Sequence, residues 1–188
     1  MKKKLVVILV TIEVIFLVRF LIGGFLFLRV CNTVSYNDDP GVIKELLDAG
    51  AFVNAQDKYG MRPLMYAASE SNNPEIIELL IENGAKVNLE DIDRMTAVMY
   101  AAENNNPEII KILIENGAEI NKRDKDGYTP LMYAVSNNSN PEIISILLDC
   151  GADPKIRDNS GYIAIDYIGN NPYLEGTAIH QRLKEVSY

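Results

Sequence analysis

The chain has 188 residues, a formal net charge of −8, and hydrophobic side chains at 48% of its positions. From Cys31 onward, 25 acidic residues stand against 13 basic ones, so this part alone carries −12. Because nucleic acids and anionic lipids attract cationic surfaces, this charge argues against both as ligands of that part and favours a protein partner with a neutral or basic surface, unless the excess serves solubility alone.

A strongly apolar segment follows three lysines at the start of the chain. Leu5 to Leu28 would form a helix about 36 Å long, which is enough to cross a bilayer. Glu13 and Arg19 each cost roughly 2.5 to 3.5 kcal/mol near the membrane centre, but the apolar residues contribute about 0.3 to 0.6 kcal/mol each and outweigh them. We therefore predict a single transmembrane helix at residues 5–28. The lysines at 2–4 predict a cytoplasmic N-terminus, with the rest of the chain exported to the periplasm or the cell exterior.

Three other interpretations of this segment stay open. A cleaved signal peptide needs an uninterrupted apolar core and small residues before the cleavage site. Leu5 to Ile12 barely provides the core, and no such cleavage site follows. Cys31 would suit a lipid anchor, but residues 28–30 are not the small residues expected before a lipidated cysteine. The third alternative is a cytosolic protein.

The middle of the chain repeats itself. Four prolines that follow Asn or Asp are separated by 34, 33 and 34 residues: Pro40, Pro74, Pro107 and Pro141. Four Gly-Ala pairs keep the same spacings and begin at Gly50, Gly84, Gly117 and Gly151. Four aspartates do so as well: Asp57, Asp91, Asp124 and Asp158. The longer spacings contain one extra residue before the proline, which we expect in the loop between two helices.

Each unit predicts a turn followed by two helices. In the third unit, Asp124 can accept hydrogen bonds from backbone amides ahead of it, and Gly127 can adopt a positive φ, so a turn is expected. Thr129, placed before a proline, predicts the start of a first helix. Asn140, also before a proline, predicts the start of a second helix, which Gly151 ends.

The recurring pattern D-x-x-G-x-T-P-L-x-x-A…E-I-x-x-L-L-x-x-G-A resembles the ankyrin repeat, a unit of 33 residues with a β-turn and two helices. The resemblance covers roughly Asp38 to Asp166. It implies an all-α fold, an ankyrin-repeat solenoid with a β-turn plus helix pair per repeat, following the N-terminal hydrophobic helix. The expected divisions are 1–29 (transmembrane anchor or signal segment), 30–54 (degenerate N-cap repeat), 55–88, 89–121 and 122–155 (ankyrin repeats), and 156–188 (degenerate C-cap repeat).

Two departures from the family pattern have expected consequences. Where the family usually has His, this chain has Met65, Met99, Met132 and Asp166. Since methionine can fill volume but cannot replace the bonds of the family's His, we expect weaker coupling between units. Arg94 stands in place of the turn glycine of the second turn, at a cost of about 1 kcal/mol if its φ is positive.

The two ends of the array are expected to be atypical, because solenoids need caps. The first helix of the N-terminal cap would have to come from Val30 to Asn37, which fits a helix poorly. At the other end, Ile179, Leu183 and Val186 recur at helical spacing among polar residues, which predicts a capping helix with a polar outer face.

We find no pattern typical of an enzyme, a cofactor site or a metal site. His180 is the single histidine, and it lies in the predicted capping helix. The four periodic aspartates suit turns better than calcium. Cys31 and Cys150 would lie about three repeats apart, too far to bridge, and we expect both to be packing residues.

The strongest candidates for a binding site are tyrosines that recur with the repeat: Tyr66, Tyr100, Tyr133 and Tyr167. The resemblance implies that this position lines a concave groove, where tyrosine is a favoured contact residue, although packing between repeats would explain it too. One helical turn further along lie Glu70, Asn104 and Asn137. The turns add Tyr59, Met61, Ile92, Asp93, Met95, Lys125, Asp126, Tyr128 and Tyr162.

The sequence therefore predicts a membrane-tethered scaffold, not an enzyme, that binds another protein through its concave face and turn tips. Two alternatives remain. The chain could be an inhibitor or protective partner of an exported enzyme, or a structural protein that self-associates through Gly23 and Gly24 of the apolar segment.

Overall fold

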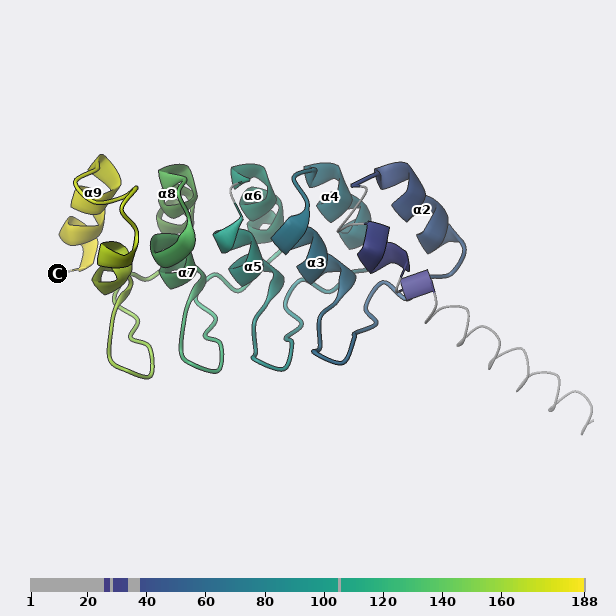
Figure 1. Ribbon diagram of the computed structural model, residues 1–188, viewed down its shortest axis with the longest axis horizontal. Coiled ribbons are helices and arrows are strands. Elements are labelled where there is room, and N and C mark those ends of the chain that lie inside the picture. The colour runs from purple at the N-terminus through teal and green to yellow at the C-terminus, as the bar shows by residue number, and fades with distance from the viewer. Residues whose placement is uncertain (1–25, 28, 34–37, 105, 188) are drawn as a thin grey trace, which may run out of the picture.

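A computed structural model describes residues 26–27, 29–33, 38–104 and 106–187 (Figure 1). The helices in chain order are α2 (Pro40–Asp48), α3 (Pro63–Glu70), α4 (Pro74–Glu82), α5 (Ala97–Glu103), α6 (Pro107–Glu115), α7 (Pro130–Asn137), α8 (Pro141–Asp149), the 3₁₀ helix η1 (Ala164–Asn170) and α9 (Ala178–Ser187). Within these residues the structure is all-helical and has no strand, as predicted. None of the helices in the described ranges is long and apolar enough to cross a membrane. The predicted transmembrane helix at 5–28 falls outside them except for residues 26–27.

The helices form two rows. The first helices α3, α5, α7 and η1 pack side by side in one row, and the second helices α2, α4, α6, α8 and α9 form the other. Each first helix also contacts the second helix of its own unit. Figure 1 shows four turns projecting from the side of the stack on which the first helices lie. This is the solenoid that the repeats predicted, in which each unit is stabilised by its neighbours.

The helix boundaries follow the predicted capping residues. Asn140 accepts a hydrogen bond from the backbone N–H of Glu142 at 3.0 Å, and Thr129 accepts one from the N–H of Met132 at 3.3 Å. Side chains at the same position begin the other second helices of the array: Asp39, Asn73 and Asn106. Gly151 ends α8 with a φ of +93°, a conformation that glycine adopts without strain.

The core is one continuous apolar cluster between the two rows. Isoleucines and leucines of the second helices pack against alanines of the first helices, and Met65, Met99 and Met132 are all buried. The sulfur of Met132 also accepts a hydrogen bond from the Thr129 N–H at 3.4 Å. The expectation that methionine would only fill volume at this position is therefore wrong in the third unit.

The extra residue of the longer units lies in a helix, so its predicted place in the loop is wrong. Helices α3 and α7 have eight residues each, whereas α5 has seven, and all three are followed by a loop of equal length before the next proline. The residue directly after each of these helices, which is Ser71, Asn104 or Asn138, makes hydrogen bonds that fix the loop. A first helix can gain one residue at its C-terminal end without disturbing those bonds.

Both ends differ in part from the sequence-based expectations. Among the described residues, 26–27 and 29–33 are helical, so this helix begins before the predicted Val30–Asn37, and 34–37 fall outside the description. Phe27, Val30 and Cys31 are buried in the core. In α9, Leu183 is buried as expected, but Val186 is 38% exposed, because the buried face continues four residues after Leu183, at Ser187.

The two cysteines are free thiols in different environments. Cys31 is buried, as expected, and burial followed by the charge of Asp57 raises the pKa of its thiol to about 12. Cys150 is exposed at the end of α8, so its prediction as a packing residue is wrong.

Candidate binding surface on the turns and first helices

Each turn is organised by one aspartate. The Oδ1 atom of Asp124 accepts hydrogen bonds from the backbone N–H groups of Asp126 at 2.9 Å and Tyr128 at 2.8 Å. The same pair of bonds recurs at Asp57, Asp91 and Asp158. The periodic aspartates thus stabilise turns, as predicted.

One turn is strained. Gly60, Gly127 and Gly161 adopt positive φ angles, and in the second turn Arg94 adopts +63° at the equivalent position. The positive φ on which the expected cost at Arg94 depended is therefore present. An arginine there carries a backbone strain that the three glycines avoid.

The four turns are also joined to one another. The Ile92 N–H donates to the Tyr59 carbonyl at 3.1 Å, and the Lys125 N–H donates to the Asp93 carbonyl at 2.9 Å. The Asn159 N–H continues the series by donating to the Asp126 carbonyl at 3.0 Å. The turns therefore present one connected surface along the stack (Figure 1).

The predicted tyrosines form a column at the base of the turns. Each hydroxyl donates to the Oδ2 atom of the aspartate in its own unit, at 2.9 Å for Tyr66, 2.5 Å for Tyr100 and 2.6 Å for Tyr133. Tyr167 makes the same bond to Asp158. All four side chains are half-buried against the core, so each ring is fixed on one side and accessible on the other.

These bonds hold the tyrosines in their neutral form. Burial, followed by the hydrogen bond to Asp57, raises the pKa of Tyr66 to about 12. The pKa values of Tyr100, Tyr133 and Tyr167 are raised above their usual range for the same reasons. Burial alone would raise the pKa of Asp158, but the hydrogen bond from Tyr167 and those from the backbone outweigh burial and lower it.

The last two units add a feature that the sequence analysis missed. The ring centroid of Tyr128 lies 5.6 Å from that of Tyr133 and 5.1 Å from that of Tyr167, and Tyr162 lies 6.1 Å from Tyr167. These four residues, which we name the tyrosine cluster, form an unbroken run of rings across two units. The signal was present in the sequence, since both pairs are five residues apart. In the first two turns, Met61 and Met95 occupy the places of Tyr128 and Tyr162.

The turn tips differ in exposure and charge. Three large hydrophobic side chains on the turns are exposed: Tyr59 at 53%, Ile92 at 59% and Tyr162 at 55%. Three charged residues at the tips are exposed as well: Asp93, Lys125 and Asp126. Met61, Met95 and Tyr128 are half-buried.

The three predicted polar contacts are not equivalent. Glu70 and Asn137 are exposed at the ends of α3 and α7, and the Asn137 amide donates to Glu103 at 2.5 Å. Asn104 is instead half-buried, and its amide donates to the Ser71 carbonyl at 3.0 Å and to two others in the same unit. The difference arises because α5 is one residue shorter. This places Asn104 in the loop, away from the exposed helix end.

Asn104 belongs to a ladder of asparagines that sequence reasoning also missed. Asn138 donates to the carbonyls of Ala102 at 2.9 Å and Asn104 at 2.7 Å, and Asn171 repeats the pattern one unit later. Asn138 and Asn171 are fully buried. Asn104 and Asn138 each lie three positions before the proline that opens the next helix, whereas Asn171 directly precedes Pro172. Only the structure shows that each amide reaches back to the preceding unit.

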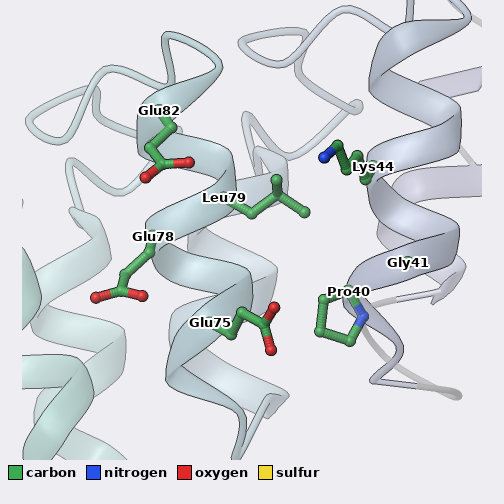
Figure 2. A pocket seen from close by; sticks show the side chains of 7 residues that line it. All are labelled: Pro40, Gly41, Lys44, Glu75, Glu78, Leu79 and Glu82. Atoms are coloured by element: carbon green, nitrogen blue, oxygen red, sulfur yellow. The ribbon is translucent and has the colours of Figure 1, made fainter.

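The opposite face of the molecule has a different character. A hollow of about 330 Å³ lies between α2 and α4. Figure 2 shows Lys44 of α2 across from Leu79 and Glu82 of α4, and Glu75 across from Pro40. Pro40 and Leu79 supply its apolar lining. Within the described ranges, no cluster of His, Cys, Asp or Glu could hold a metal ion.

Comparison with known proteins agrees with this architecture. The family described as Ankyrin repeats (3 copies) matches residues 30–91 and 68–158, which together make up more than half of the chain. No curated protein matches the chain in this comparison. Ankyrin repeats generally mediate protein–protein interaction. The chain belongs to the ankyrin-repeat family.

Proposed function

We propose that this protein is a membrane-tethered scaffold whose repeats bind another protein through the turns and the adjacent tyrosine column. The observation that supports this most is the set of exposed hydrophobic side chains on the turns, represented by Tyr59, Ile92 and Tyr162. Solubility does not explain them, and the backbone bonds between turns hold them in a fixed array. The outer helices instead expose mainly charged residues such as Glu75, Glu78 and Glu82.

The tether is the apolar segment that begins at Leu5. Phe27 is buried, at 8% exposed, so we place the end of the membrane span before residue 26. Leu5 to Phe25 would still reach about 31 Å as a helix, which matches the hydrocarbon thickness of a bilayer. With the lysines at 2–4 on the cytoplasmic side, the repeats would lie outside the cytoplasm.

The binding proposal can be tested by site-specific photo-crosslinking in intact cells. A photoreactive phenylalanine analogue replaces Ile92 on the second turn in one variant and the exposed Glu78 on α4 in the other. We expect capture of a second protein from position 92 and little or none from position 78. Equal capture from both faces, or capture of this chain alone, would contradict binding through the turns.

The tether needs its own experiment. We expect the chain to stay with membranes after an alkaline carbonate wash, and added protease to digest the repeats of cells whose outer layers have been removed. Release by the wash would exclude a transmembrane anchor. Repeats protected until the membrane is lysed would show that they face the cytoplasm.

A further inference from the structure

We infer that the tyrosine cluster of the last two units (Tyr128, Tyr133, Tyr162 and Tyr167) binds arginine or lysine side chains of a basic segment in the partner protein. The inference rests on the proposed function and adds the chemistry of the partner. It is carried by the arrangement of the four rings and by the carboxylates around them.

The rings form a fixed platform. Tyr133 and Tyr167 are held by hydrogen bonds to Asp124 and Asp158, and Tyr128 lies between them within 5.6 Å of both ring centroids. Tyr162 extends the platform to the fourth turn and is 55% exposed. Binding a cation on these rings costs the protein little side-chain entropy, because the rings are already ordered.

Negative charge surrounds the platform. Asp126 is exposed at the tip of the third turn, and Glu103 is exposed at the end of α5. Both contribute, after burial and the bond to Asp124, to the raised pKa of Tyr133. A basic side chain on the rings would thus meet carboxylates at their edge, whereas an acidic segment would be repelled.

The basic residues of these turns are already engaged within the molecule. The Lys125 ammonium lies 3.5 Å from Asp93, and the guanidinium of Arg123 donates to Asn159 at 3.0 Å. The Arg157 guanidinium donates to the Gly161 carbonyl at 2.6 Å. These bonds orient the three side chains: Lys125 pairs with a carboxylate, and Arg123 and Arg157 donate to neutral oxygens.

The first turn provides an example of the same contact. The Lys58 ammonium lies 4.7 Å from the centroid of the Tyr59 ring, on the connected surface of the four turns. The tyrosine cluster offers four rings where this turn offers one. The hydroxyls of Tyr133 and Tyr167 also donate to carboxylates, which increases the electron density of these two rings and favours a cation over a neutral group.

The test measures binding of two short glycine-serine peptides to the full chain in non-ionic detergent. One peptide carries two arginines, and the other carries two citrullines, which keep the planar shape without the charge. We expect the arginine peptide to bind about tenfold more tightly. Tyr162→Leu should reduce that binding about fivefold, and Tyr162→Phe should recover most of the loss. The matched control is Tyr173→Leu, which removes a 72% exposed tyrosine outside the cluster and should change nothing.

Two results would overturn the inference: equal binding of both peptides, or the same affinity for Tyr162→Leu and Tyr173→Leu. Folding of the variants is checked by circular dichroism, and since Tyr162 is exposed we expect no loss of structure. Capture of a partner from position 92 together with either of these results would leave the proposed function standing and remove only the basic specificity. Absence of any captured partner would instead count against the proposed function itself.

Discussion

Thr129 caps the first helix of the third unit, whereas Arg62 and Thr96 do not cap the equivalent helices of the first two units. The Oγ1 atom of Thr129 accepts the Met132 N–H, but the buried Oγ1 of Thr96 has no hydrogen-bond partner among the residues that the structure describes. Arg62 turns its guanidinium to the carbonyls of the turns instead. The units therefore keep the same backbone fold although their capping hydrogen bonds differ, because the shared core holds the units together.

The turns show the same contrast. Asp124 and Asp158 are each 5% exposed, whereas Asp57 and Asp91 are only half-buried. The ladder position holds a fully buried asparagine at Asn138, but a serine in the first unit. We therefore predict that the half of the array containing the tyrosine cluster is the more rigid one, and that the first two units open more readily.

The largest expected effect comes from Asn138→Ala. It removes two hydrogen bonds to carbonyls of the preceding unit, one of them buried and the other part-buried, and a part-buried one from the Asn140 N–H, so we expect a loss of about 3 kcal/mol in the free energy of unfolding. Ser71→Ala at the same position should cost about 1 kcal/mol, since within the described residues the Ser71 hydroxyl bonds to the Asp38 side chain and the Asn73 backbone and, unlike the Asn138 amide, to no carbonyl of the preceding unit. Urea unfolding measures both, and equal losses would contradict the difference between the two halves.

A smaller difference is expected between two turn aspartates. Asp124→Ala should cost about 2 to 3 kcal/mol and Asp57→Ala about 1 to 2 kcal/mol, because both lose bonds to two amides and a tyrosine but only Asp124 is fully buried. Hydrogen exchange of the Tyr128 and Met61 amides reports each turn separately. The comparison fails if Asp57→Ala proves the more damaging.

Alkaline pH should weaken the first unit through Tyr66. The folded chain raises the pKa of Tyr66 from 10.0 to about 12, so it holds this proton more tightly than the unfolded chain does. The resulting stabilisation is complete below pH 10 and is lost as the pH rises through about 12. Tyr66→Phe should lower stability at pH 8 and flatten the decline above pH 10, as measured by urea unfolding at each pH. Tyr173→Phe is the control, and an identical flattening there would exclude a specific effect of Tyr66.

The repeat was predictable because its markers are local. Asp124, Thr129, Asn140 and Gly151 each act on a backbone group within a few residues, so spacing alone indicated turns, caps and helix ends. What the sequence did not show depends on contacts between units. The bonds of the asparagine ladder join residues 33 to 36 positions apart, and the Tyr128–Tyr167 contact joins the two units of the tyrosine cluster, so both form only when units stack.

The wrong predictions have the same origin. The extra residue was assigned to a loop because loops usually absorb insertions, but the bonds of Ser71, Asn104 and Asn138 fix those loops, so the helix lengthens instead. Val186 was predicted to be buried from its spacing within one helix. Which face of α9 is buried instead depends on where its neighbours η1 and α8 lie, and that face includes Ser187 but not Val186.

The smallest expected effect concerns the strain of the second turn, and it has the opposite sign. Arg94→Gly places at φ +63° the residue type found at the three equivalent positions, and relieves a strain of about 1 kcal/mol. The substitution also removes a half-exposed ion pair with Glu90 at 3.7 Å, which contributes at most a few tenths of a kcal/mol. We therefore expect a net gain of about 0.5 kcal/mol in the free energy of unfolding. Asp93→Gly, one residue earlier and without a positive φ, should lower stability instead. If both glycine variants lost stability, backbone strain at Arg94 would not be among the reasons that the first two units are the weaker half.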